Sequence, residues 1–401
     1  MIARRLALLL ALAGAWSAAG YLLWESTVPS SLRLPHLDPH AYFSAAQLAA
    51  AADFSRLETI LFWLGTLAQL VALGLYARYG DRWAWGSAAG PVGTGMLLGM
   101  LGFALVWVVQ LPFGVVDLWW QRRHQLSHVD YASFLFGNWG ALAGQFVFLC
   151  FALLVVMGLA RFVGDRWWLP AAPVFVGLAL LFTFVSPYLT TTTPLRDPEL
   201  RAAANRFERA EGVGHVPIRV EQVHDVTSLP NAEAMGLGSS RRVVLWDTML
   251  NGRFSEPELR VVVAHELGHL ARNHLWRSVG WFALFAFPGT FLLSRVARRR
   301  GGMREPDAVP LALFALVVLT LLALPLENAI SRHMEAEADW LALRTTHDPA
   351  AARGLFTRFV PTTLDEPSPD TFDYLMLENH PTIMQRLAMT RAYATSEAQS
   401  P

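Results

Sequence analysis

This chain of 401 residues contains no lysine, one cysteine and few charged side chains of either sign. Only 16% of its residues are charged and its net charge is zero, whereas about a quarter of the residues of a typical soluble protein are charged. Without a basic excess, nucleic acid is excluded as an expected partner. The lone cysteine, Cys150, excludes an intramolecular disulfide. The exclusive use of arginine among the 32 basic residues is typical of a GC-rich bacterial genome.

In place of charge the chain has long apolar runs, and 54% of its residues are hydrophobic. Each run approaches the roughly 20 residues with which a helix crosses a bilayer core. The runs lack the alternation of strands, and a soluble helical core would need charged faces that they do not have. We therefore expect an all-α polytopic membrane protein with about seven transmembrane helices, in the lipid bilayer of a bacterial inner membrane. The runs are Leu6–Trp24, Thr59–Tyr76, Val92–Val116, Trp139–Leu159, Leu169–Tyr188, Val279–Val296 and Val309–Leu326.

The first run has two interpretations. Arg4 and Arg5 before a leucine-rich stretch, with small residues following, are also typical of a cleavable signal peptide. We favour a retained helix, because the run stays apolar as far as Trp24. N-terminal sequencing distinguishes the two, since a mature start near Gly20 would indicate cleavage.

Two polar regions are large enough to carry chemistry, and they divide the chain into four expected segments. Residues 1–189 hold five membrane runs, 190–277 form a small α+β insert, 278–327 form a membrane hairpin, and 328–401 form a helical C-terminal segment. Within the insert, alternating or extended patterns predict a small sheet, and Pro198 begins a predicted helix. The predicted strands are Val216–Val223, Asn231–Gly238 and Arg242–Trp246, and the predicted helix is Pro198–Ala210.

The motif that carries chemistry is His265-Glu266-Leu267-Gly268-His269. Two histidines four residues apart lie on one face of a helix and can share one metal ion, while the glutamate can take a proton from a metal-bound water. Ser255 and Glu258 form a capping box that begins this helix. With no strong break before Pro288, the helix is expected to continue into the sixth apolar run. The motif therefore predicts a hydrolase with one zinc ion.

The third zinc ligand is predicted from chain length. His269 lies 32 residues before Gly301, and Glu335 lies 33 residues after Gly302, so a turn at the glycine pair returns Glu335 to the level of His269. Asp339, four residues later, is a candidate to orient a ligating histidine. The alternative for both acidic residues is a solvated helical face.

Four other histidines are predicted not to be ligands. His124 and His128 have no glutamate between them, His274 is five residues from His269 and points elsewhere, and His333 is off the face of Glu335.

Three segments together resemble a known family. They are VVVAHELGHLARNH at 261–274, NAISRHMEAEAD at 328–339 and HPTIMQR at 380–386. This chain is similar to the integral-membrane zinc proteases of the type I CAAX prenyl endopeptidase family. The likeness extends to Leu111-Pro112-Phe113, Asn231-Ala232 and Asp247-Thr248, and covers most of the chain in order.

The resemblance implies a helical membrane chamber with zinc at one end. It assigns His265, His269 and Glu335 as zinc ligands and Glu266 as general base. It further assigns Asp339 as the residue behind a ligand, His380 as an oxyanion donor supported by Arg386, and Asn231-Ala232 as the edge that pairs with a peptide substrate. The chain is shorter than eukaryotic members, and a bacterial cell lacks prenylated CAAX substrates, so the mechanism is expected to carry over and the substrate is not.

Orientation and alternatives stay open at this stage. Eleven arginines in or beside short connections lie on the side away from the zinc and four on the zinc side, which places the zinc outside the cytoplasm by the positive-inside rule. The family suggests the opposite. An HtpX-like membrane quality-control protease is an alternative enzyme. A metal-dependent scaffold or transporter without catalysis is the alternative of another class, which Glu266 disfavours because a structural metal site needs no general base.

Overall fold

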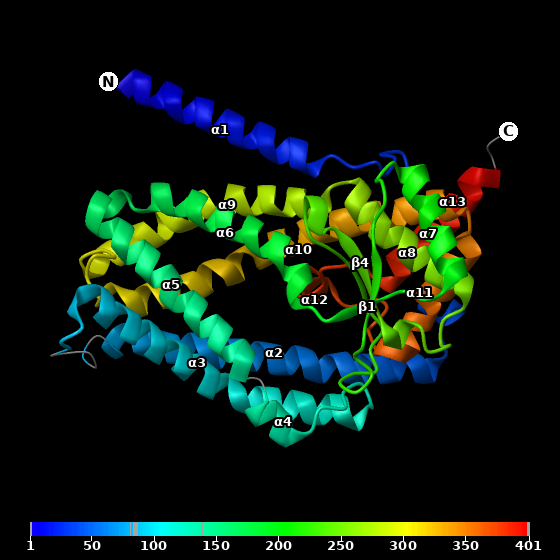
Figure 1. The fold of residues 1–401 in the computed structure, drawn as a ribbon, viewed down its shortest axis with the longest axis horizontal. Helices are drawn as coiled ribbons and strands as arrows, with labels where there is room; N and C mark the ends of the chain where they lie inside the picture. Colours follow the sequence, from blue (N-terminus) through cyan, green and yellow to red (C-terminus); the bar gives the residue numbers. More distant parts are fainter. Residues whose placement is uncertain (1, 81, 83–86, 138, 399–401) are drawn as a thin grey trace.

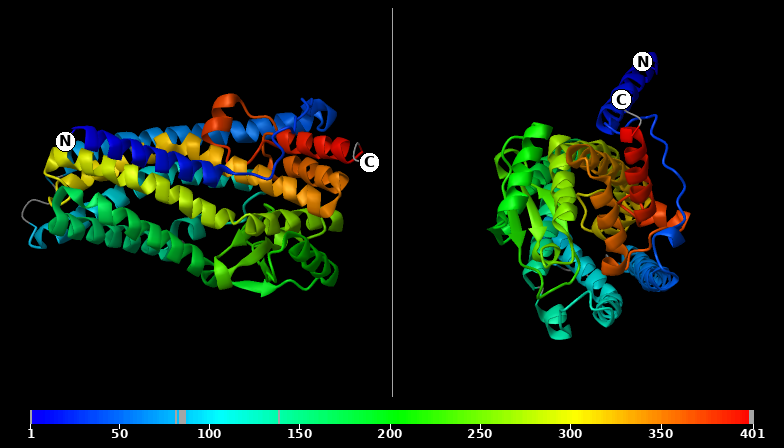
Figure 2. Two further views of the ribbon diagram at one scale, coloured as in Figure 1. Left: turned by 90° about the horizontal axis from the view of Figure 1, so that it is seen from above. Right: turned by 90° about the vertical axis from the view of Figure 1, so that its right-hand side faces the viewer.

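The structure, a computed structural model, describes residues 2–80, 82, 87–137 and 139–398. The molecule is elongated, with a bundle of long helices at one end and a mixed α/β region at the other (Figures 1 and 2). The helices are α1 (Ile2–Trp24), α2 (Ala45–Tyr79), α3 (Gly90–Arg123), α4 (Tyr131–Phe136), α5 (Trp139–Val163), α6 (Trp168–Leu189), α7 (Pro198–Glu211), α8 (Glu256–Ala271), α9 (His274–Ala297), α10 (Ala308–Thr346), α11 (Pro349–Thr363), α12 (Thr371–Met376) and α13 (Ile383–Ala398).

Within the described residues, six helical segments are long and apolar enough to cross a membrane. Their outward faces carry many exposed leucine, valine and phenylalanine side chains, which lipid would cover. The first apolar run forms α1, whose apolar stretch Leu10–Trp24 is shorter than the other six. The predicted fold class is thereby confirmed. The six segments are Ala45–Tyr79, Gly90–Arg123, Tyr131–Arg166, Trp168–Leu189, His274–Arg300 and Ala308–Thr346.

A four-stranded sheet lies beside the metal-motif helix in the order β1-β2-β4-β3. Its strands are β1 (Thr192–Pro194), β2 (Ile218–Glu221), β3 (Ala232–Met235) and β4 (Arg242–Trp246). Three of them fall within the predicted strands, and β1 was not predicted. Strand β3 is an edge strand that pairs antiparallel with β4 on one side only. Its other edge has no strand partner within the residues that the structure describes.

The motif helix does not continue into the sixth apolar run, and that expectation was wrong. Helix α8 ends at Ala271 and α9 begins at His274. Between them Asn273 has φ of +54°, the left-handed conformation that asparagine adopts more readily than most residues. The helix is interrupted at this residue, and His274 at the start of α9 lies beside His269 near the end of α8.

The hairpin of α9 and α10 turns at the glycine pair, as predicted. Gly301 and Gly302 have φ of +82° and +81°, which residues with a Cβ rarely adopt. Helix α10 then runs for 39 residues, past the bundle and into the α/β region. It is therefore both a membrane helix and part of the wall of the candidate site.

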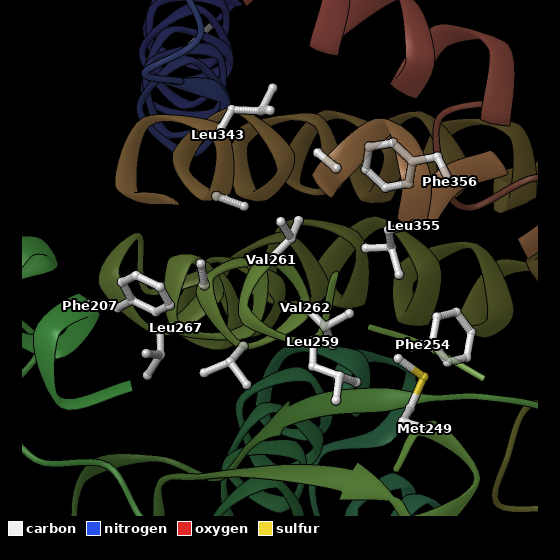
Figure 3. Close-up of a cluster of buried hydrophobic side chains, with 14 of the residues drawn as sticks. Phe207, Met249, Phe254, Leu259, Val261, Val262, Leu267, Leu343, Leu355 and Phe356 are labelled. Carbon is white, nitrogen blue, oxygen red and sulfur yellow. The ribbon is translucent and has the colours of Figure 1, made fainter. Parts of the chain in front are cut away.

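The core of the α/β region is built around α8. Leu259, Val261 and Leu267 of α8 pack with Leu343 of α10 and Phe356 of α11, and Leu267 is fully buried (Figure 3). Because α8 is surrounded by apolar side chains on most sides, its two histidines are held on a rigid support.

Candidate metal centre

The beginning of α8 is fixed by its own sequence. Ser255 N–H donates to Glu258 Oε2 at 2.7 Å, and Pro257 occupies the first turn, where no N–H is needed. Arg358 of α11 bonds the same carboxylate at 3.2 Å. Further along, Gly268 brings α8 close to α10, since a Cβ there would lie 3.5 Å from Ala338 Cα. The capped, closely packed helix sets the height and rotation of the two motif histidines.

Three polar side chains converge near the end of this helix. His265 Nε2 lies 3.0 Å from His269 Nε2 and 3.2 Å from Glu335 Oε2, and His269 Nε2 lies 3.5 Å from Glu335 Oε1. The ligand atoms of the three residues all lie within 4.8 Å of one another. Two neutral imidazole nitrogens that face each other need a shared proton or a shared cation between them. The structure thus brings together the three residues that the sequence analysis selected as metal ligands.

The other ring nitrogen of His265 faces Asp339. His265 Nδ1 lies 2.9 Å from Asp339 Oδ1, although the approach is bent away from a straight hydrogen bond. Arg386 of α13 donates to both oxygens of this carboxylate, at 2.8 and 2.6 Å. Its guanidinium also lies over the ring of Phe356, 4.2 Å from the centroid. Asp339 and Arg386 therefore support His265 on the side of its Nδ1, and both also line the cavity beside Glu266 and His380.

His274 is a neighbour of the site that the sequence analysis missed. The expectation that it points away from His269 was wrong, because that expectation assumed one continuous helix. The break at Asn273 returns His274 Nδ1 to 2.9 Å from His269 Nδ1. Its Nε2 lies 3.0 Å from Glu337 Oε2, a carboxylate with no exposed surface. The remaining three histidines stay apart from the cluster: His124 bonds Trp120 O, His128 bonds Ser228, and His333 bonds Trp24 O.

His380 lies on the open side of the cluster. Its Nε2 is 3.4 Å from Glu335 Oε2, and about half of its side chain is exposed. Nδ1 lies 2.6 Å from the side-chain oxygen of Asn379. Hydrogen bonds from α10 hold the segment before His380 in place. Arg332 donates to Tyr374 O at 2.8 Å and to Glu378 O. Asn328 donates to Met376 O at 2.8 Å. Arg332 and Asn328 are thus further residues of the site region, recognisable in sequence only through the resemblance.

Glu266 lies between the cluster and the sheet edge. It is 7% exposed, and the backbone of Ala234 in β3 bonds its carboxylate. Asn231 O accepts from Trp246 N of β4 at 2.9 Å. Because successive residues of a strand point opposite ways, the backbone polar groups of Ala232 face away from β4. A cavity of about 100 Å³ is lined by Asn231, Ala232, His265, Glu266 and His380 together with apolar residues of α8 and α11.

Burial shapes the acid–base character of the site. Removal from water raises the pKa of the Glu266 carboxyl, although the neighbouring histidines oppose this shift. A carboxylate with a raised pKa is a better proton acceptor near neutral pH than an ordinary glutamate.

Comparison with known proteins places this geometry in a family. The sequence profile of peptidase family M48 matches residues 194–394, half of the chain. The uncharacterized metalloprotease YhfN of Bacillus subtilis is 24% identical over 393 residues, 92% of this chain and 91% of that protein. CAAX prenyl protease 1 of Saccharomyces cerevisiae is 33% identical over 132 residues, 32% of this chain and 29% of that enzyme.

Two further matches cover the membrane fold and the peptidase region. A protease HtpX homolog of Acidiphilium cryptum is 33% identical over 221 residues, 49% of this chain and 74% of that protein. The crystal structure of S. mikatae Ste24p superposes with a TM-score of 0.70 at 18% identity, covering 93% of this chain and 95% of that one. The latter shows the same fold. With its paired histidines and glutamate on α8 and α10, this chain belongs to peptidase family M48 and is a membrane metalloprotease.

Proposed function

We propose that this protein is a single-zinc endopeptidase that hydrolyses peptide bonds at a membrane surface, with His265, His269 and Glu335 as the metal ligands. The supporting observation is the convergence of these three side chains, with ligand atoms within 4.8 Å of one another. Two imidazole nitrogens and one carboxylate are a donor set typical of catalytic zinc, which keeps its fourth position for water. The family implies a divalent metal, and this donor set favours zinc among the divalent ions.

The proposed chemistry assigns one task to each neighbouring residue. When bound, zinc would polarise the scissile carbonyl and lower the pKa of a water molecule. Glu266 accepts the proton of the attacking water and delivers it to the leaving amine. With a proton on Nε2 as well as on Nδ1, His380 is the proposed hydrogen-bond donor to the oxyanion that develops on the carbonyl. Asp339 and Arg386 hold the His265 ring in place during these steps.

The edge of β3 is the proposed substrate track. The free backbone groups of Ala232, beside Asn231, can pair with an extended peptide and carry its scissile bond past Glu266. Backbone pairing does not depend on side-chain identity, so the substrate class is a peptide or unfolded protein segment. The enzymes named CAAX prenyl protease 1 and protease HtpX homolog share the peptidase region. We infer that this protein shares their catalytic mechanism. We do not extend the prenylated substrates of CAAX prenyl protease 1 to it.

We also propose a location for the protein and a role for each segment of the chain. The host membrane is proposed to be the plasma membrane of a bacterium, given the composition and the match to a Bacillus protein over nine-tenths of the chain. Residues 1–189 form the membrane bundle, 190–277 the catalytic insert, 278–327 the membrane hairpin, and 328–401 the C-terminal part with the third ligand. The lipid bilayer is then a permanent partner of the exposed apolar faces.

A Glu266→Ala variant tests the proposal. We expect it to bind one zinc per chain and to lose cleavage of quenched fluorescent peptides, because the metal ligands remain and the proton acceptor is gone. Glu208→Gln is a matched control, since Glu208 is a comparably buried carboxylate in α7 that bonds Val216 N at 2.9 Å. Full activity in Glu266→Ala would refute the mechanism. Zinc bound without turnover in the wild type would instead favour a metal-dependent scaffold.

A further inference from the structure

The side of His269 that faces away from the cluster ends in a chain of buried hydrogen bonds. His269 Nδ1 lies 2.9 Å from His274 Nδ1, and His274 Nε2 lies 3.0 Å from Glu337 Oε2. His274 is 3% exposed and Glu337 is 0% exposed. Of these three residues, only His269 reaches the metal position. His274 and Glu337 therefore act on the metal only through the ring of His269.

The position of each proton in this series of hydrogen bonds follows from its last residue, Glu337. A carboxylate accepts hydrogen bonds, so Glu337 requires the proton of His274 to be on Nε2. His274 Nδ1 is then an acceptor, and it requires the proton of His269 to be on Nδ1. The lone pair of His269 is thereby left on Nε2, the atom that faces His265 and Glu335. The arrangement selects the one tautomer that can bind a metal at this position.

Glu337 is itself fixed by donors from three directions. Arg272 Nε donates at 2.8 Å, Arg277 Nη1 at 2.7 Å and Thr27 N at 2.6 Å. These three donors, two of them positively charged, require the carboxylate of Glu337 to accept hydrogen bonds. Arg277 also donates to Leu23 O at 2.7 Å, which joins the end of α1 to the same network.

From this geometry we propose that His274 and Glu337 are positioning residues that set the tautomer and orientation of His269. The inference rests on the proposed zinc site but concerns how one ligand is held. Carboxylate or backbone partners behind a ligating histidine typically change metal affinity by about 10–100-fold when removed. His265 has Asp339 in the corresponding position, so each histidine of the motif has its own support.

The test measures zinc affinity by competition with a chelator in the purified full-length protein. We expect His274→Phe to weaken zinc binding about 10–100-fold, because Nδ1 of His269 loses its acceptor. His274→Asn, which can still offer an oxygen to that Nδ1, should recover part of the loss. Glu208→Gln, the buried carboxylate in α7, should leave zinc affinity unchanged.

One further readout and one further variant separate positioning from folding. The visible absorption of the cobalt-substituted protein reports ligand geometry and should change in His274→Phe but not in Glu208→Gln. If His274→Phe does not fold, Glu337→Gln and His274→Asn decide the question. Wild-type zinc affinity and an unchanged cobalt spectrum in the folded variants would overturn the proposal. Zinc bound normally by a wild type that cleaves nothing would count against the proposed function alone.

Discussion

Replacement of Asp339 is the perturbation with the best-defined consequence. The carboxylate lies 2.9 Å from His265 Nδ1, accepts two bonds from Arg386, and is 2% exposed. Asp339→Ala leaves the Arg386 guanidinium buried without its counter-charge. Breaking one partner of a buried ion pair costs about 3–5 kcal/mol of folding free energy. Asp339→Asn keeps the shape and one acceptor, so its folding cost should be smaller.

The effect on metal binding is separate from the effect on folding. Loss of the charge behind His265 should weaken zinc binding about 10–100-fold in Asp339→Asn, which corresponds to about 1.4–2.7 kcal/mol. We would measure thermal unfolding of the zinc-free protein in detergent, and zinc affinity by chelator competition. Asp339→Ala should lower both stability and affinity, and Asp339→Asn mainly affinity. If Asp339→Asn bound zinc as tightly as the wild type, the support of His265 by Asp339 would be refuted.

Three further predictions concern other parts of the molecule. His380→Ala should reduce turnover about 10²–10³-fold with zinc content unchanged, measured as kcat on a fluorescent peptide; a change confined to KM would argue against an oxyanion role. Gly236→Ala should destabilise the protein by more than about 1 kcal/mol, because φ is +82° and a Cβ would meet Ser240 O at 2.4 Å; an unchanged melting temperature would contradict this. His224 bonds Asp247, which raises the pKa of the histidine. The contribution of the His224–Asp247 pair to folding stability should be full below pH about 6.5 and be lost as the pH rises through the raised pKa of His224. The melting temperature of His224→Gln should therefore approach that of the wild type at high pH. A constant difference across that range would be the contrary result.

Features encoded in local spacing could be predicted from the sequence. The i,i+4 histidines fix one helical face, and the pair Gly301-Gly302 fixes the turn that returns Glu335 to His269. The capping box at Ser255 marks the beginning of α8. The paired histidines and the capping box depend on a few neighbouring residues. The return of Glu335 was predicted from the length of the hairpin, which left a solvated helical face open as the alternative.

Features set by a single backbone angle or by long-range contact could not be predicted. Asn273 is of a residue type that favours the left-handed conformation, but a single asparagine was too weak a signal to end the predicted helix, and without that angle His274 was assigned to the wrong direction. Strand β1 has only three residues, Thr192–Pro194, and exists because it pairs with β2. The burial of Glu337 likewise depends on Thr27, which is 310 residues away in sequence.

The proposed metal ligands are split between α8 and α10, and this split has a consequence for biosynthesis. Glu335 leaves the ribosome 66 residues after His269, and between them lies a hairpin that has to enter the bilayer and return. On this ligand assignment, a nascent chain with a folded α8 holds two of the three ligands and no complete centre. The assignment therefore predicts that the peptidase is inactive until Glu335 has been synthesised and the hairpin has been inserted.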